Sequence, residues 1–403
     1  MKVNQIIKSR IFKNFYLLFS SNILSRFVAF FARMITVRLF EVEVFGEINF
    51  YISIINYILL TINLGFDIYF TQKCNEGFSI SHAIKIQYTL RGLLLLFYSF
   101  ILILIYIFSP FKNIVFYALF IRILPTLFDI EWAYRVRNQY KSIFVIALIH
   151  SLISLVFVPV IYLWPQKTIL LMSLIVPEIS RLLLLYYFQS TRLKFVSIKE
   201  NIYIIKNSIW INLSTIFVTI YYNIDTIFLG IFKNTYDVGI YSAAYNIMLM
   251  AIVPTGILFN SYSNRLSQNK FSKHVFKEFL LVTSLLGVLS FLILFFLAPF
   301  IIPILYGEKY LESVPILQYL SLNVLACYVA GGIVNPLNLW GFYKEFCILV
   351  LISAVFNICA NYYLIPVFGI SAAIFTTIAS EVIVILLGIC LHFFLKIKNT
   401  NFN

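Results

Sequence analysis

Charged residues are scarce in this sequence. Only 11% of the 403 residues are Asp, Glu, Lys or Arg, whereas 62% are hydrophobic, and the mean hydropathy is +0.94. A soluble domain of this length cannot bury so much apolar surface in its interior. The scarcity of charge therefore excludes a soluble globular protein and indicates an all-α polytopic membrane protein.

Sequence motifs of catalysis are also absent. The chain has no G-x-S-x-G, no D-x-D, no paired histidines and no G-x-x-x-x-G-K-[ST]. Its five cysteines form no C-x-x-C pair, so the sequence predicts neither a disulfide framework nor a zinc site. We therefore expect a transporter and not an enzyme, with no catalytic residue, no bound metal and no organic cofactor.

Long apolar runs account for most of the chain. A helix that crosses a bilayer needs roughly 20 apolar residues. The first run carries arginines and lacks a small-residue cleavage site, so we expect it to stay in the membrane and not to act as a cleaved signal. Twelve spans are predicted, at residues 14–36, 46–66, 86–109, 112–134, 142–163, 168–189, 208–231, 239–261, 278–303, 313–340, 346–365 and 370–395.

The basic residues indicate the topology. The chain has 30 Lys and Arg against 16 Asp and Glu, a net charge of +14. With the N-terminus placed in the cytoplasm, 20 of the basic residues fall on the cytoplasmic side and 5 on the opposite side. This bias is the positive-inside pattern of membrane proteins. It places both termini in the cytoplasm and explains the positive charge without a nucleic-acid partner.

The spans divide into two groups of six. The longest polar connection, residues 190–207, separates an N-terminal lobe (1–200) from a C-terminal lobe (201–403). Similar segments recur around Gly46 and Gly239, 193 residues apart, and around Glu178 and Glu381, 203 residues apart. Because each half has an even number of spans, an axis along the membrane normal would relate the two bundles.

Several charged residues lie inside the predicted spans, where exposure to lipid is costly. Arg26 and Arg33 are seven residues apart in the first span, so they share one helical face. All five cations within the spans lie in the first half of the chain. Such residues commonly line a transport path, and an anionic substrate is the simplest match. The candidate substrate-binding residues are Arg26, Arg33, Arg91, Arg122, Arg181 and Asn22.

Each of these arginines also has a purely structural alternative. An ion pair between Arg33 and Asp225 would satisfy both charges, and Arg91 could extend its guanidinium to the membrane surface. As a further alternative, Asp129 and Glu131 at the end of the fourth span could form local ion pairs with Arg135 or Arg137. The acidic residues best placed to bind Na⁺ or carry H⁺ are Glu178, Asp225 and Glu381.

Four stretches resemble a known family. They are "RLFEVEVFGEINF" (38–50), "IDTIFLGIFKNTYDVGIYSAAYNIMLMAIVPTGILFNSYSNRLS" (224–267), "LYGEKYLESVPILQYL" (305–320) and "PVFGISAAIFTTIASE" (366–381). In order and character they resemble the Wzx-type polysaccharide flippases. These belong to the MATE-like superfamily that also contains multidrug extruders and lipid II flippases. Lipid II flippases usually have fourteen spans, two more than are predicted here.

The resemblance implies a mechanism and a location. It implies two six-helix bundles that move an undecaprenyl-diphosphate-linked oligosaccharide from the cytoplasmic to the periplasmic leaflet of the bacterial inner membrane by alternating access. The arginines named above would hold the diphosphate by charge-assisted hydrogen bonds. The resemblance leaves open whether the glycan is the O-antigen of lipopolysaccharide or another polysaccharide. It also leaves open association with a polysaccharide polymerase and a chain-length regulator.

Two other functions compete with this prediction. A multidrug or cation antiporter of the same superfamily would favour a cavity of acidic and aromatic residues over five arginines in one lobe. An integral-membrane enzyme of polysaccharide biosynthesis would need a catalytic loop at the membrane surface. The predicted outer connections, such as "SPFK" and "WPQK", are too short to supply one.

Overall fold

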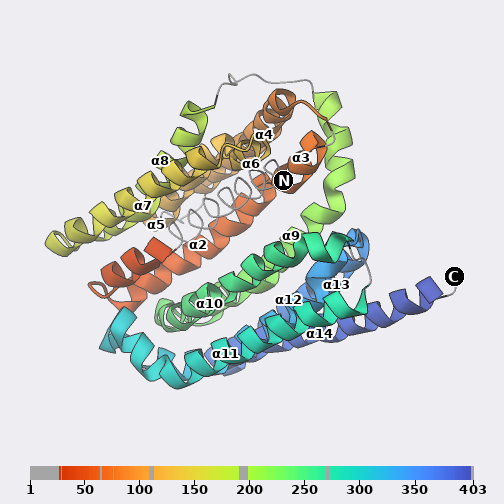
Figure 1. The fold of residues 1–403 in the computed structure, drawn as a ribbon. Coiled ribbons are helices and arrows are strands. Elements are labelled where there is room, and N and C mark those ends of the chain that lie inside the picture. The colour runs from red at the N-terminus through yellow and green to blue at the C-terminus, as the bar shows by residue number, and fades with distance from the viewer. Residues whose placement is uncertain are drawn as a thin grey trace, which may run out of the picture. The chain divides into compact units, whose positions relative to one another are not determined.

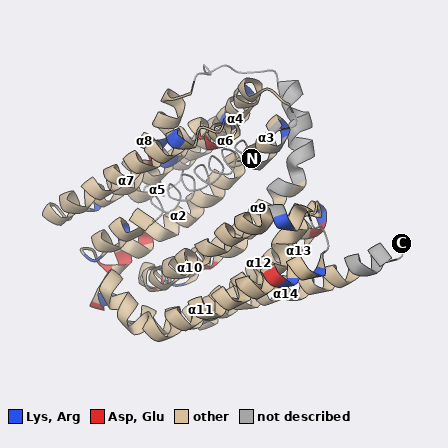
Figure 2. Cartoon of the chain, viewed as in Figure 1, with Lys and Arg blue, Asp and Glu red and all other residues tan. Residues whose placement is uncertain are grey.

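Helices account for nearly all of the described chain (Figure 1). The computed structural model describes residues 27–400 except 29, 64–65, 76, 109–112, 190–197 and 269–271, and these ranges contain no β-strand. Charged side chains are few along the helices (Figure 2). The all-α class predicted from the sequence is therefore confirmed.

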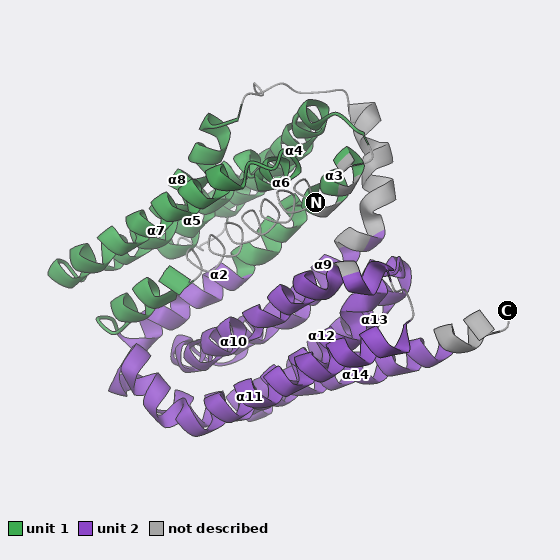
Figure 3. Ribbon diagram, viewed as in Figure 1, with its two compact units in different colours: residues 1–40, 54–209 green, residues 41–53, 210–403 purple. Residues whose placement is uncertain are grey.

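Two compact units make up the fold (Figure 3). Unit 1 comprises residues 1–40 and 54–209, and unit 2 comprises residues 41–53 and 210–403. The helix α2 (Val42–Asn63) thus contributes residues 42–53 to unit 2 and its remainder to unit 1. The functional lobes expected at 1–200 and 201–403 stay a prediction.

Unit 1 contains a buried core rich in aromatic residues. Phe70 of α3 stacks on Trp132 of α6 with ring centroids 5.4 Å apart, and Tyr88 of α4 is buried beside them. This core joins short helices to long ones. The elements of unit 1 after α2 are α3 (Phe66–Asn75), α4 (Ile80–Phe108), α5 (Ile114–Phe120), the 3-10 helix η1 (Ile121–Phe128), α6 (Glu131–Val136), α7 (Tyr140–Leu163), α8 (Lys167–Tyr187) and the start of α9 (Ile198–Phe232).

Unit 2 is arranged around one enclosed helix, α12. In its most apolar window, 67% of the residues are buried, against 17% in α4, so other helices cover most of its surface. It packs against α10, α11 and α14. The elements of unit 2 after α9 are α10 (Thr235–Gln268), α11 (Lys273–Tyr306), the 3-10 helix η2 (Glu308–Tyr310), α12 (Ser313–Leu339), α13 (Tyr343–Phe368) and α14 (Ile370–Thr400).

Ten helices in the described part of the chain are long and apolar enough to cross a membrane. Their outward faces carry large apolar side chains, such as Leu96, Phe100 and Phe108 on α4, which are 60–80% exposed. Apolar faces of this extent require lipid as their solvent. The chain is therefore a multi-pass membrane protein. Most of the first predicted span, 14–36, lies outside the described residues.

The fourth predicted span, 112–134, is not one continuous helix, and this expectation was wrong. The segment is divided into α5, η1 and α6. Asn113 caps the start of α5, and Pro125 lies within η1, where it cannot donate a main-chain hydrogen bond. Asp129 and Ile130 then leave the helical conformation before α6 begins. Apolar composition predicted the length of this segment correctly but could not show the break.

Within unit 2, α2 and α10 cross at two glycines. A Cβ atom added at Gly46 would lie 1.7 Å from the carbonyl oxygen of Thr235, and one added at Gly239 would lie 2.4 Å from that of Val42. Val42 and Thr235 are 193 residues apart, the same offset as the two glycines. The contact is therefore reciprocal, as at a local two-fold axis, and it agrees with the internal repeat of the sequence.

Replacing Gly46 by alanine is expected to destabilise unit 2. The added methyl group meets main-chain atoms, which cannot move aside as a flexible side chain can, so we expect a loss of about 1–3 kcal/mol. The measurement is the thermal unfolding midpoint of the purified protein in detergent. The matched control is Gly256→Ala in α10, where an added Cβ has no atom within 4 Å. Equal midpoints for the two variants would contradict this account of the crossing.

Candidate functional site

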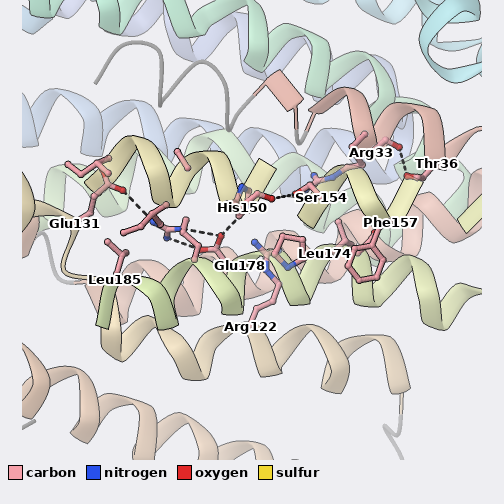
Figure 4. A pocket seen from close by; sticks show the side chains of 17 residues that line it. Arg33, Thr36, Arg122, Glu131, His150, Ser154, Phe157, Leu174, Glu178 and Leu185 are labelled. Atoms are coloured by element: carbon pink, nitrogen blue, oxygen red, sulfur yellow. Dashed lines mark hydrogen bonds and ion pairs between the residues drawn. The ribbon is translucent and has the colours of Figure 1, made fainter. Parts of the chain in front are cut away.

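Unit 1 contains a cavity of about 360 Å³ between α7, α8 and the segments that face them (Figure 4). Charged groups line one part of it, and Phe157 and Leu174 line another. Its walls come from the helical stretch 30–37, η1, α6, α7 and α8. The lining residues are Ala32, Arg33, Thr36, Arg122, Glu131, Ile143, Ile146, Ala147, His150, Ser154, Phe157, Ser173, Leu174, Pro177, Glu178, Arg181 and Leu185.

Helical periodicity explains which residues of α7 and α8 reach the cavity. Those of α7 recur every three or four residues, with Ile146 and Ala147 as an adjacent pair, which places them on one face of the helix. Those of α8 repeat in the same way from Ser173 to Leu185. Small side chains on these faces, including Ala147, Ser154 and Ser173, leave the space that larger residues would fill.

Three hydroxyl groups of the wall bond to their own helices. Thr36 Oγ1 donates to the carbonyl oxygen of Arg33 at 2.9 Å, and Ser154 Oγ donates to that of His150 at 2.9 Å. Ser173 Oγ donates to the carbonyl oxygen of Leu170 at 2.6 Å. Figure 4 shows the first two bonds at the edge of the cavity.

Arg181 is surrounded by carboxylates. Its Nη2 lies 2.9 Å from Oε1 of Glu178 and 3.4 Å from Oδ2 of Asp129, and its Nη1 lies 3.4 Å from Oε2 of Glu131. The Arg181 side chain is 20% exposed, so solvent screens these pairs only in part. Asp129 and Glu131 stand where the fourth predicted span is broken, and the break lets both turn toward α8.

His150 extends this charged cluster across to α7. Its Nε2 lies 3.8 Å from Oε2 of Glu178, and its buried Nδ1 has no hydrogen-bond partner in the described part of the chain. His150 is not among the site residues predicted from the sequence, because no other histidine lies near it in the chain. The three- and four-residue spacing from Ile143 to Phe157 is the signal that could have placed it on the cavity face.

Arg122 differs from the other cations of the cavity. It projects from η1 and points into the pocket beside Glu178 (Figure 4). Within the described residues its guanidinium makes no hydrogen bond and no ion pair, and its Nε is buried. Glu178 is a neighbouring charge beyond ion-pair distance. The cavity therefore holds a guanidinium whose donors are available to a ligand.

Arg91 does not line this cavity. It is 1% exposed, and its Nη1 donates to the carbonyl oxygens of Thr126 at 2.9 Å and Asp129 at 2.5 Å. Gln87, one turn earlier on α4, donates to the same Asp129 carbonyl at 2.6 Å and accepts from Nε1 of Trp132 at 2.6 Å. These bonds bring side-chain donors to main-chain carbonyl groups at the end of η1, where the Asp129 carbonyl no longer lies in a helix.

The remaining arginines and Asn22 from the prediction differ in position. Asn22 and Arg26 lie outside the described residues. Arg33, like Arg122 and Arg181, lines the cavity. The structure thus brings three of the predicted arginines together with Glu178 in unit 1.

Asp225 and Glu381 are both buried in unit 2, where α9 meets α14. Asp225 is 1% exposed and accepts hydrogen bonds from Tyr241 at 3.0 Å, from Asn361 and from Thr377. Glu381 is 2% exposed and accepts hydrogen bonds from two tyrosines of α9. Neither carboxyl group makes an ion pair within the described residues.

Comparison with known proteins relates this architecture to transporters. The sequence model of the family described as "Polysaccharide biosynthesis protein" matches residues 35–315. No curated protein sequence matches the chain.

Three solved structures share the fold. An inward-facing multidrug resistance MATE family transporter of the MOP superfamily aligns with a TM-score of 0.68 and 13% identity, over 92% of this chain and 95% of that one. Lipid II flippase MurJ in an inward closed conformation aligns with a TM-score of 0.72 and 13% identity, over 93% of this chain and 86% of that one. A MOP superfamily transporter from Pyrococcus furiosus aligns with a TM-score of 0.61 and 12% identity, over 94% of each chain. The expected MATE-like fold is therefore confirmed.

The different surroundings of Arg91 and Arg122 predict opposite effects on stability. Arg91→Met removes two hydrogen bonds from a buried charged donor, each worth about 1.5–3 kcal/mol, and also the ion-pair partner of Asp67, so we expect a clearly lower thermal unfolding midpoint. Arg122→Met removes a cation that has no bonded partner in the described chain, so we expect a midpoint within about 0.5 kcal/mol of the wild type or above it. Equal destabilisation of the two variants would contradict these assignments.

Proposed function

The chain belongs to the polysaccharide biosynthesis protein family, and from this membership we propose that it is a lipid-linked oligosaccharide flippase. It moves undecaprenyl-diphosphate-linked repeat units from the cytoplasmic to the periplasmic leaflet by alternating access. The shared fold of MATE transporters and a lipid II flippase supports a carrier over an enzyme.

The guanidinium of Arg122, which has no partner within the described ranges, carries this proposal. A cation enclosed in a membrane protein is expensive unless a counter-charge or an acceptor faces it. Arg33 and Arg181 line the same cavity, so the three can present several donors to one anion. A diphosphate has many acceptor oxygens and suits bidentate hydrogen bonds from guanidinium groups.

The other proposed substrate residues take different parts. Arg181 is neutralised by Asp129, Glu131 and Glu178, so a diphosphate would bind it by competing with these carboxylates. Arg91 does not contact the substrate on this proposal. It holds the turn that carries Asp129, which pairs with Arg181. Arg26 and Asn22 stay candidates from the sequence.

The size of the cavity limits what it can hold. About 360 Å³ is at the small end of ligand pockets, which range from about 300 to 1,000 Å³. It suits the diphosphate and the adjoining part of the glycan. The polyprenyl chain remains in lipid, and further sugars must lie beyond this cavity.

The energy for transport can come from the membrane potential. Moving an anion outward across an inside-negative membrane is favoured by about 2.3 kcal/mol per charge per 100 mV. A coupled ion, H⁺ or Na⁺, would use Glu178, Asp225 or Glu381.

On this proposal the protein acts in the bacterial inner membrane, where a polysaccharide polymerase and a chain-length regulator would use its product, for example an O-antigen.

A multidrug or cation antiporter is the competing function, because the same cavity contains Glu131 and Glu178. In the described structure both carboxylates are paired with Arg181, whereas Arg122 has no partner. This balance favours an anionic ligand over a cationic one.

Binding of a diphosphate lipid by Arg122 variants tests the proposal. A hydrogen bond to a charged group contributes about 1.5–3 kcal/mol, so Arg122→Gln should weaken binding of undecaprenyl diphosphate by roughly 10- to 100-fold. The measurement is equilibrium binding to the protein in nanodiscs. Arg265→Gln is the charge-matched control, because Arg265 is exposed and pairs with Glu278 outside the cavity. Unchanged affinity in Arg122→Gln, or tighter binding of a cationic dye than of the diphosphate lipid, would contradict the proposal.

Ion coupling has its own test in proteoliposomes. If a carboxyl group couples an ion, then flipping of the lipid should slow when the H⁺ or Na⁺ gradient is collapsed at constant membrane potential. The corresponding variant, Glu178→Gln, Asp225→Asn or Glu381→Gln, should lose this sensitivity. Wild-type flipping that is indifferent to both gradients would remove ion coupling from the mechanism and leave the flippase proposal in place.

A further inference from the structure

Glu381 is a carboxyl group in an environment with no positive charge. It is 2% exposed on α14, and in the described part of the chain no lysine, arginine or histidine lies within ion-pair distance of it. The polar groups around it are the hydroxyls of Tyr221 and Tyr222 from α9 and the thiol of Cys327 from α12. An isolated carboxylate in such surroundings is very costly, whereas a neutral carboxylic acid is not.

The two tyrosine hydrogen bonds to Glu381 reach the same carboxyl oxygen. Tyr222 donates to Oε1 at 2.8 Å and Tyr221 donates to the same atom at 3.2 Å. The two phenol rings pack together with centroids 4.5 Å apart, which fixes both donors on one side of the carboxyl group. A carboxylic acid has this asymmetry, because its carbonyl oxygen accepts while its other oxygen carries the proton.

Asp225 provides the contrast. It lies one helical turn after Tyr221 on α9, and its three donors are divided between its oxygens. Asn361 donates to Oδ1, whereas Tyr241 and Thr377 donate to Oδ2. Donors on both oxygens suit an anion.

The surroundings of Glu381 suit a proton better than a metal cation. Hard cations such as Na⁺ need several oxygen ligands, and here the group beyond the two phenols is a sulfur. The Tyr222 hydroxyl also lies 3.5 Å from Sγ of Cys327, which Asn323 approaches at 3.6 Å. Thiol and phenol groups can donate or accept hydrogen bonds, so they can accommodate either protonation state of a neighbour.

From this geometry we infer that Glu381 is held as a neutral carboxylic acid and is the group that takes up and releases a proton during the transport cycle. The second part rests on the proposed flippase function, and the first does not. The proton leaves when rearrangement of the helices admits water or a cation to Glu381, and it returns when the site closes.

Infrared spectroscopy of the purified protein in nanodiscs tests the protonation state. The wild type at neutral pH should show the C=O stretching band of a buried protonated carboxyl group. Glu381→Gln, which preserves the shape and the acceptor oxygen, should remove that band, whereas Asp225→Asn and Glu178→Gln should retain it. Absence of the band in the wild type, its persistence in Glu381→Gln, or its loss in Asp225→Asn would overturn the inference.

Proton movement tests the role in transport and separates the two proposals. With a pH indicator inside proteoliposomes, the wild type should move protons when the lipid substrate is flipped, and Glu381→Gln should lose this signal while it still binds undecaprenyl diphosphate. Flipping by the wild type without proton movement would overturn the role of Glu381 and leave the flippase function intact. Failure to bind the lipid at all would overturn the flippase function, while the infrared result would still stand.

Discussion

A guanidinium inside a membrane protein must face oxygen atoms, because hydrocarbon offers it none. Unit 1 meets this requirement in different ways. Arg91 donates to main-chain carbonyl oxygens, and Arg181 is surrounded by carboxylates. Arg122 faces a cavity instead and has no acceptor within the described residues, and on the proposed function a substrate supplies one. The arrangement of unit 1 follows from how these requirements are met.

The broken fourth span connects stability to the site. A helix break in the membrane frees carbonyl groups that need donors, and buried donors on α4 need acceptors. Gln87 and Arg91 satisfy the carbonyl of Asp129, and Arg91 also satisfies that of Thr126. With the break secured in this way, η1 can present Arg122 to the cavity. The interactions that stabilise unit 1 thus also position its candidate ligand-binding cation.

Much of the fold could be predicted from runs of apolar residues, because span length is a local property. The helix expected at 142–163 is found at Tyr140–Leu163. The break inside 112–134 could not be predicted, since it depends on donors some forty residues earlier in the chain. Three of the predicted arginines line one cavity. The burial of Arg91 depends on tertiary packing, which spacing in one helix does not show, whereas the spacing of lining residues along α7 could have placed His150 on the cavity face.

The hydroxyl groups in the cavity wall determine what kind of molecule can lie against them. Thr36, Ser154 and Ser173 each direct their proton to a carbonyl oxygen of their own helix. Only their oxygen lone pairs remain for a guest, so that part of the wall can accept hydrogen bonds but cannot give them. The hydroxyl groups of a sugar ring can donate to these lone pairs. An ionised phosphate has only acceptor oxygens and cannot.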